Sequence, residues 1–307
     1  MNKIYLINLL IISVIIGGCS APSDIQLKDL LDRYIADKDA TIGIAVIMAN
    51  DTVIVNGEMP FPMMSVYKFP IAMAVAEKCR NNGMDFSQSC EVNPSDMHND
   101  TYSPMMEKYA MESPFTITLN ELLKYSLQLS DNNASDILLK WLGGAEVADR
   151  YIHSLDIENI SIRYTEAELH MNPGYSYLNS STPLAMASLL DRFNKEFDDS
   201  LSISLKQIMA SCSTGSDRLA KPFLSEECTI IHKTGTGFLL PSGRLMALND
   251  VGYIHCAGNM PYSIAVFICD AAYTTEESAT IIADISEIVR QKIAPTYMER
   301  RDLNLGR

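Results

Sequence analysis

Three short runs of residues carry the side chains best suited to covalent chemistry in this chain. The first, Ser65-Val66-Tyr67-Lys68, puts an amine three residues after a hydroxyl. On a helix this spacing brings both groups to one face. A serine hydroxyl is a weak nucleophile at neutral pH, and a neighbouring amine in its neutral form supplies the base that it needs. Taken alone, the run favours a helix cap followed by a solvated lysine.

The other two runs favour the chemical interpretation. Ser130-Asp131-Asn132 lies in a polar loop between two predicted helices, and Lys233-Thr234-Gly235 ends a predicted strand. Each of the three patterns occurs once, and for this composition their ordered occurrence by chance is below about 1 in 1,000. A glycine at the third position lets a ligand approach the backbone closely. We therefore interpret the three runs as one site.

The set of three motifs resembles that of the class A serine β-lactamases, over nearly the whole chain after residue 19. Pro62-Met63-Met64-Ser65, Tyr102-Ser103-Pro104-Met105 and the run from Leu129 to Asp136 further resemble the Bacteroides-type, extended-spectrum cephalosporinase branch. The resemblance implies a hydrolase that opens the β-lactam ring through an acyl-enzyme on Ser65. It implies no cofactor and no metal, and a small β-lactam as the substrate.

The same resemblance implies a role for each motif residue. Ser65 is the expected nucleophile, Lys68 its base, and Ser130 the proton shuttle to the leaving lactam nitrogen, while Asp131 is expected to be structural. The N–H groups of Ser65 and Thr236 are the expected oxyanion hole. The residues expected to bind substrate in these motifs are Asn132, Lys233, Thr234, Gly235 and Thr236.

Deacylation requires a base that activates water. The run from Arg163 to His170 lies before a predicted helix and resembles the omega loop of class A enzymes, so Glu166 is the expected general base and Glu168 a structural residue. A solvated acidic loop is the alternative, because the chain is rich in acidic residues. His170 stands where most relatives have an asparagine that helps to hold the hydrolytic water. We count His170 among the expected substrate-binding residues, and this departure puts the shape of the loop and the substrate range in doubt.

Two further assignments remain open in the sequence. The run Thr214-Gly215-Ser216-Asp217-Arg218 resembles the segment that supplies the carboxylate-binding arginine in this branch, whereas Arg244 matches the position used in other relatives. We prefer Arg218. Tyr102 is either an aromatic gate over the substrate or a half-buried core residue.

The pattern of apolar residues indicates strands at both ends of the chain and helices between them. Helical spacing is found over 24–37, and β-branched residues indicate a hairpin of 41–48 with 52–55. Three later strands are predicted at 228–234, 245–255 and 262–270, followed by a helix over 276–292. The helices predicted in the middle of the chain cover 66–79, 118–129, 134–142, 146–155, a helix opened by Thr182-Pro183, and 201–210.

This order predicts an α+β fold of the serine β-lactamase and penicillin-binding-protein type. One antiparallel sheet is flanked by the terminal helices, in an α/β sandwich, and an all-helical domain is inserted. We assign residues 24–60 and 211–295 to the sheet-and-helix domain. Residues 61–210 form the all-helical domain, with an omega-type loop at about 160–180. A cleft between the two is the natural place for a pocket.

Composition and the first residues bear on partners and location. The formal net charge of −14 disfavours nucleic acid as a partner. Residues 1–19 have a lysine, an apolar run and the step Gly17-Gly18-Cys19, as in a bacterial export signal with a lipobox. We expect an exported, periplasmic, membrane-anchored lipoprotein of a Gram-negative bacterium, lipidated at Cys19 and monomeric. A plain signal peptide with an incidental cysteine is the alternative.

The remaining cysteines and the histidines do not indicate a metal site. Six cysteines follow Cys19, none in a C-x-x-C pair, and they allow 15 complete disulfide pairings or an equally plausible set of buried free thiols. The five histidines show no ligand spacing. The cysteines are Cys79, Cys90, Cys212, Cys228, Cys256 and Cys269, and the histidines are His98, His153, His170, His232 and His255.

Two other functions share the three motifs. A cell-wall D,D-peptidase, or a tethered sensor that stays acylated, would use the same serine, lysine and K-T-G strand. An omega-type loop with Glu166 and the lack of an extra domain are not expected of the peptidase. The lack of a transmembrane segment or signalling domain is not expected of the sensor. Cephalosporins are the favoured substrates, on Thr236 and on the branch that the chain resembles.

Overall fold

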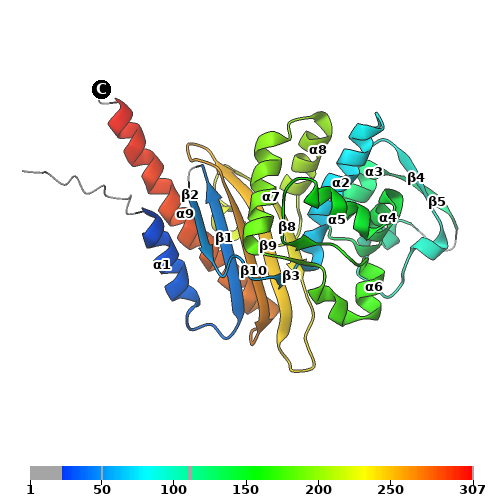
Figure 1. The fold of residues 1–307 in the computed structure, drawn as a ribbon, viewed down its shortest axis with the longest axis horizontal. Coiled ribbons are helices and arrows are strands. Elements are labelled where there is room, and N and C mark those ends of the chain that lie inside the picture. The colour runs from blue at the N-terminus through cyan, green and yellow to red at the C-terminus, as the bar shows by residue number, and fades with distance from the viewer. Residues whose placement is uncertain (1–22, 50, 110–112, 306–307) are drawn as a thin grey trace, which may run out of the picture.

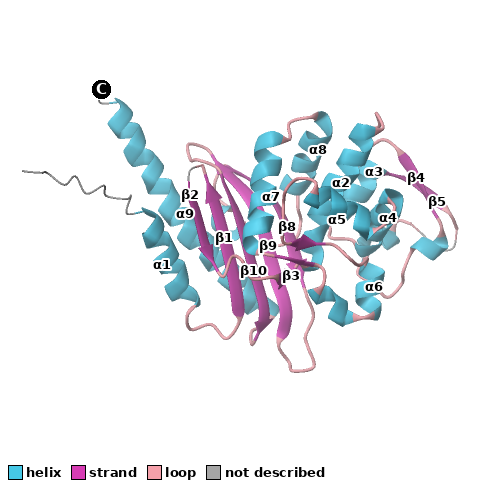
Figure 2. Cartoon of the chain, viewed as in Figure 1, coloured by secondary structure: helices cyan, strands magenta, loops and turns pink. Residues whose placement is uncertain are grey.

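A five-stranded antiparallel sheet divides the molecule (Figures 1 and 2). The computed structural model describes the backbone of residues 23–49, 51–109 and 113–305, so the expected export signal and Cys19 lie outside the described residues. The strand order is β2-β1-β10-β9-β8, which brings strands from both ends of the chain together. Its strands are β1 (Thr41–Met48), β2 (Asp51–Val55), β8 (Cys228–Thr236), β9 (Leu245–Cys256) and β10 (Tyr262–Ala271).

Side-chain alternation along the strands gives the sheet two apolar faces. In β1, Ile42, Ile44 and Val46 belong to the core on one face, whereas Ala45 belongs to the core on the other. α1 (Ser23–Ile35) and α9 (Thr275–Leu305) contact each other and cover the first face. α7 (Pro183–Glu196) covers the second face, against β1, β9 and β10. The α+β sandwich predicted from the sequence is confirmed.

Most of the remaining helices pack around α2, and α6 packs against α4 instead (Figure 1). The run from Phe69 to Ala76 is apolar on all sides of α2, which contacts α3, α4, α5 and α8, and this run is entirely buried. These helices are α2 (Lys68–Asn81), α3 (Leu119–Gln128), α4 (Asn132–Leu142), α5 (Ala145–His153), α6 (Glu166–Met171) and α8 (Ser200–Ala210). Short 3₁₀ turns are η1 (Met64–Tyr67), η2 (Pro94–Asp96), η3 (Pro104–Glu107), η4 (Pro173–Tyr177) and η5 (Lys221–Phe223).

The segment 61–210 differs from the all-helical domain expected for it. It contains two small sheets in the described residues, and its helix α7 packs on the main sheet rather than around α2. These strands were not predicted from the sequence, because each has only two to four residues, too few to show an alternating pattern. They are β3 (Phe61–Pro62), β6 (Ile160–Ser161) and β7 (Ser180–Ser181) in one sheet, and β4 (Ser89–Val92) and β5 (Phe115–Thr118) in the other.

The pairing of the cysteines, left open by the sequence, is partly resolved by the sheet. Cys228 on β8 and Cys256 on β9 are partners in the strand register and form a disulfide. Glu226 lies close enough to both sulfurs for a three-ligand metal site, but sulfurs joined in a disulfide are not thiolate ligands. The described cysteines without a disulfide are Cys79, Cys90, Cys212 and Cys269.

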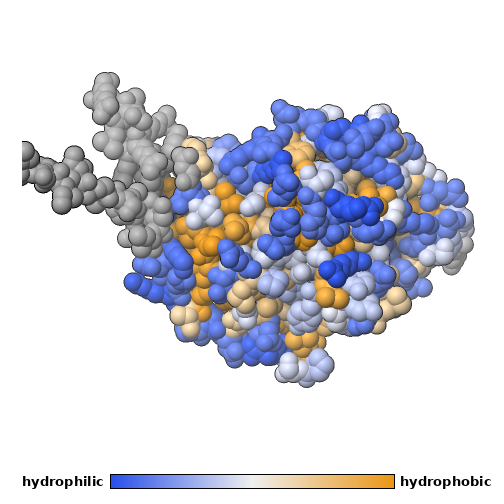
Figure 3. Space-filling view, viewed as in Figure 1, coloured by the Kyte–Doolittle hydropathy of each residue, from blue (hydrophilic) through white to orange (hydrophobic). Residues whose placement is uncertain are grey.

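Hydrophilic and hydrophobic side chains are distributed unevenly over the surface. On the face drawn in Figure 3, hydrophilic side chains cover most of the helical half, and hydrophobic side chains gather over the main sheet. Within the part of the chain that the structure describes, no helix combines the length and apolar character needed to cross a bilayer.

Candidate active site

The three motifs meet where η1 packs against the edge strand of the sheet. η1 carries Ser65, which is half-buried, and contacts β8 and β9. A side-chain carbon on Gly235 would lie 2.5 Å from the carbonyl oxygen of Met63, so only glycine permits this approach. Asn249 on β9 donates from Nδ2 to the carbonyls of Pro62 (2.9 Å) and Met63 (3.0 Å). The start of the first motif is therefore fixed beside the third.

Lys68 is the residue that joins the motifs. Its side chain is fully buried, and its ammonium donates to the Ser130 carbonyl at 2.8 Å and to Asn132 Oδ1 at 2.6 Å. It also lies 3.0 Å from Glu166 Oε1, in an ion pair with a carboxylate that is only 12% exposed. A buried ammonium is expensive unless such partners surround it. Lys68 thus connects the serine-bearing turn, the S-D-N motif and the omega-type loop.

Ser130 connects the two lysines of the site. Its backbone has φ of +60°, a left-handed conformation that is strained for a residue other than glycine. In this conformation its carbonyl accepts from Lys68 while its hydroxyl accepts from Lys233 Nζ at 3.0 Å. Burial lowers the pKa of Lys233 to about 7, with the nearby charge of Lys68 acting in the same direction. A lysine with this pKa exchanges protons readily near neutrality.

Asp131 is structural, as the sequence predicts. Its buried carboxylate caps α4 by accepting from the Ala134 amide at 2.8 Å, and it also accepts from the Met105 amide and the Ser103 hydroxyl. Burial raises the pKa of this carboxyl group, partly offset by those hydrogen bonds. The segment that carries Tyr102 is thereby held to the start of α4.

The omega-type loop runs from β6 to β7 and is closed at its neck by Asn179. The buried side chain of Asn179 accepts from the amides of Arg163 (2.8 Å) and Tyr164 (3.0 Å) and donates to the Tyr164 carbonyl. Inside the loop, the rings of Tyr164 and Tyr175 stack with centroids 4.2 Å apart. The loop is therefore a packed element that presents α6 toward Lys68.

Two carboxylates fix the position of Glu166 at the start of α6. Glu168 forms a capping box with Thr165, accepting from its amide at 2.8 Å, so the structural role expected for Glu168 is present. Asp136 on α4 accepts from the Glu166 amide at 2.7 Å and from the Ala167 amide at 2.9 Å. Burial and the nearby Glu166 raise the pKa of Asp136 to about 7. Asp136 follows Asn132 by one helical turn, so the sequence places both on one face of α4, but its contacts with α6 come from tertiary packing.

His170 does not join the Lys68 and Glu166 contacts. Its imidazole is about half exposed, and Nε2 lies 3.1 Å from Asp100 Oδ2 on the opposite segment. His170, expected from the sequence as a substrate-binding residue, therefore lies at the exposed side of the loop, and its role in substrate binding stays a prediction. Tyr102 is 59% exposed, which excludes the half-buried core alternative and leaves an aromatic ring at the rim of the site.

The two candidate arginines lie in different surroundings. Arg218 is buried, and its guanidinium donates to Thr236 Oγ1 at 2.7 Å and to the carbonyls of Gly235 and Asn249. Arg244 forms ion pairs with Asp270 and Asp39, and neither partner is a motif residue. Thr234, which lies on β8 with Thr236, shares a 2.6 Å hydrogen bond with Thr214. The K-T-G strand is thus supported by Arg218 and Thr214.

The comparisons with known proteins agree over most of the chain. The model of the "Beta-lactamase enzyme family" matches residues 26–293. A β-lactamase of Bacteroides uniformis is 37% identical over 272 residues, 86% of this chain and 90% of that protein. The crystal structure of a class A β-lactamase from Bacteroides cellulosilyticus DSM 14838 gives a TM-score of 0.84 at 34% identity, covering 89% and 99% of the two chains. The TLA-1 extended-spectrum β-lactamase gives 0.84 at 32% identity, covering 88% and 99%.

The double contact of Asp136 with α6 generates a testable prediction. Asp136→Asn leaves a single acceptor oxygen for two amide donors, so one of the Glu166 and Ala167 amides loses its partner. We expect hydrogen-exchange protection over residues 165–171 to fall about 10-fold, as for the loss of about 1.4 kcal/mol. Asp149→Asn is the matched control, because Asp149 accepts one amide, that of Ile162. Equal protection in both variants would show that Asp136 does not hold α6.

Proposed function

Because this chain belongs to the class A β-lactamases and is a serine hydrolase of that family, we propose that it turns over β-lactams through Ser65 and Glu166. The single observation that carries this proposal is the ion pair of 3.0 Å between Lys68 and Glu166. It puts a carboxylate next to the amine of the serine motif. An enzyme that only acylates has no use for that carboxylate, whereas a hydrolase needs it.

In the proposed acylation, the Ser65 hydroxyl attacks the lactam carbonyl and Lys68 accepts its proton. Lys68 reaches the neutral form required for this by passing its resting proton to Glu166, with which it is paired. The C–N bond of the ring then breaks, and the nitrogen takes a proton from Ser130. Lys233 replaces that proton, because its ammonium contacts the Ser130 hydroxyl and its pKa of about 7 favours the transfer.

After acylation, Glu166 gives up to solvent the proton that it took from Lys68, and Lys233 takes one from solvent, so both regain their resting charges. In the proposed deacylation, Glu166 then removes a proton from water, and the hydroxide formed attacks the ester carbonyl on Ser65. The ester bond to the Ser65 oxygen breaks, and Ser65 recovers a proton from Glu166. The expected oxyanion hole, the N–H groups of Ser65 and Thr236, holds the developing charge in both steps. Asn132 binds the substrate's side-chain amide, and Tyr102 lies at the rim. The substrate carboxylate meets Lys233, Thr234 and Thr236.

The substrate range is the finer part of the proposal. We propose that cephalosporins are favoured, because Thr236 offers a hydroxyl at the strand end and is held by Arg218. The similar TLA-1 protein is named an extended-spectrum β-lactamase, which supports a broad site. His170, paired with Asp100 across the rim, adds a contact that a bulky substrate must accommodate.

The role of Glu166 is tested by intact mass after mixing with a cephalosporin. The wild type is expected to hydrolyse excess cephalosporin with little adduct, and to hydrolyse it faster than it hydrolyses a penicillin. Glu166→Gln is expected to retain an adduct on Ser65 and to lose turnover by about 10²–10⁴-fold. Glu168→Gln is the control, since it removes a neighbouring carboxylate that caps α6. A wild type that stays acylated for hours would favour the peptidase or sensor alternative instead.

The carboxylate-binding arginine is tested by steady-state kinetics of Arg218→Ala and Arg244→Ala. We expect kcat/KM for a β-lactam to fall about 10- to 100-fold in the first variant, because a charged hydrogen bond to Thr236 is lost. The second variant is expected to change kcat/KM by less than about 3-fold, because Arg244 contacts Asp39 and Asp270. The reverse order would assign the role to Arg244.

We propose that the protein is exported and anchored through a lipid on Cys19. The disulfide between Cys228 and Cys256 supports an oxidising compartment, and the lipobox-like step supports the anchor. Wild-type protein expressed in a Gram-negative host is expected in the detergent phase of a phase separation, and Cys19→Ala in the aqueous phase. Equal partition of the two into the aqueous phase would leave a plain signal peptide.

A further inference from the structure

The turn that carries Ser65 has a strained backbone. Met64, the first residue of η1, has φ of +47°, a left-handed conformation that is costly for a residue other than glycine. The N–H of Ser65 belongs to the planar peptide group that joins it to Met64, so the dihedral angles of Met64 set the direction of this N–H. Strain of this kind persists only where the surrounding structure holds it. The contacts of the residues before Ser65 therefore decide where one donor of the expected oxyanion hole points.

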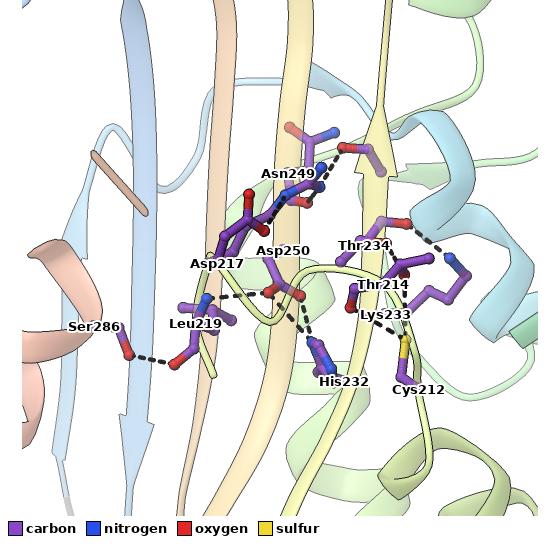
Figure 4. A network of polar contacts seen from close by, with 12 residues as sticks. Cys212, Thr214, Asp217, Leu219, His232, Lys233, Thr234, Asn249, Asp250 and Ser286 are labelled. Carbon is purple, nitrogen blue, oxygen red and sulfur yellow. Dashed lines mark hydrogen bonds and ion pairs between the residues drawn. The ribbon is translucent and has the colours of Figure 1, made fainter. Parts of the chain in front are cut away.

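Asn249 holds this turn from the main sheet. It lies on β9 beside the K-T-G strand and is fully buried (Figure 4). Its Nδ2 has two hydrogens to donate, and it contacts two acceptors, the carbonyls of Pro62 at 2.9 Å and Met63 at 3.0 Å. The Met63 carbonyl belongs to the peptide group on the other side of Met64. Asn249 thus fixes the peptide plane that precedes the strained residue.

The orientation of the Asn249 amide is also determined. Its Oδ1 accepts from the Ile268 amide of β10 at 3.3 Å, so the oxygen faces β10 and the nitrogen faces the turn. A reversed amide would put an oxygen against two carbonyl oxygens and an N–H against an N–H. Asn249 is therefore a fixed donor to the turn.

Gly235 makes room for this contact. It is the register partner of Asn249, so a side chain at position 235 would project from the same face of the sheet as the Asn249 amide. A side-chain carbon there would lie 2.5 Å from the Met63 carbonyl oxygen and 3.3 Å from Asn249 Nδ2. The glycine of the K-T-G motif thus leaves the space in which Asn249 meets Met63. Thr236, the second expected donor of the oxyanion hole, follows Gly235 directly.

Met63 is held at its amide as well as at its carbonyl. The Met63 amide donates to the Asn179 carbonyl at 2.9 Å, and Asn179 closes the neck of the omega-type loop. With both of its backbone polar groups engaged, Met63 cannot rotate freely. Met64 therefore cannot relax to a right-handed conformation without breaking one of these contacts or moving Ser65.

We propose that Asn249 is a positioning residue for acyl transfer. Its amide keeps Met64 in the left-handed conformation, and this conformation directs the Ser65 N–H toward the oxygen of the reacting carbonyl. Asn249 is buried beneath the turn and acts through Met63 and Met64 rather than on the substrate. The inference rests on the proposed function, because it assigns a role in the same reaction.

The first test compares Asn249→Asp with Asn133→Asp. Asn133 is the matched control, because it is also buried, donates to the His98 carbonyl at 3.0 Å and accepts from the His98 amide at 2.8 Å. In each variant the acceptor oxygen stays and the amide donor is lost. Phenylboronic acid is the probe, because its boron becomes tetrahedral on the Ser65 oxygen and presents an oxygen to the oxyanion hole.

We expect the dissociation constant of phenylboronic acid to rise about 30-fold in Asn249→Asp and less than about 3-fold in Asn133→Asp. Asn249→Ala is a second variant in case the first does not fold, since water can fill the space of the amide and satisfy both carbonyls. We expect its dissociation constant to rise about 10-fold, because the direct contact is lost. Equal affinities in the wild type and the Asn249 variants would overturn the inference.

Acylation by a cephalosporin, followed by intact mass after rapid mixing, separates positioning from general damage. We expect the rate constant of acylation to fall in parallel with the affinity for the boronic acid. The dissociation constant of the complex before acylation is expected to change less than about 3-fold, because the oxyanion hole acts on charge that develops during the reaction. The reverse pattern, or equal losses in Asn133→Asp, would contradict the positioning role. A wild type that neither binds the boronic acid nor is acylated would instead contradict the proposed function.

Discussion

The buried ammonium of Lys68 is the constraint on which the site depends. Removing such a charge from water costs several kcal/mol unless it is paired and hydrogen-bonded. The three partners that compensate it, Ser130, Asn132 and Glu166, come from the end of the α3–α4 loop, the start of α4 and the start of α6. A change that moves any of these segments away from Lys68 therefore leaves its buried charge without one of its partners. This explains why Ser130 keeps a left-handed backbone and why α6 is held from two sides.

The strands and motifs were predictable because their signals are local. The three C-terminal strands lie within two residues of their predicted ranges, and the motifs lie at element boundaries where turn and cap residues are recognisable. The meeting of the motifs at one site was inferred from their ordered occurrence and from a resemblance. Its physical basis, the close approach of Gly235 to Met63, depends on tertiary packing that no single segment encodes.

The parts that the sequence left open depend on long-range partners. The pairing of Cys228 with Cys256 follows from strand register, and one-residue changes of register would separate them. His170 was expected to bind substrate, and nothing in the sequence indicated that its imidazole contacts Asp100, a residue 70 positions earlier. The position of α7 on the main sheet likewise depends on which of two apolar surfaces it covers, and helical periodicity does not distinguish them.

The close packing between Gly235 and Met63 has a consequence for how this protein adapts. The floor of the site has no spare volume, because an added carbon there would meet main-chain atoms that cannot rotate away. Tyr102 and the pair of His170 with Asp100 are exposed and bound by few contacts. Substitutions that adapt the site to new drugs are therefore expected at these exposed residues, where a side chain can change size without destabilising the fold. Substitutions at the contact between Gly235 and Met63 are not expected.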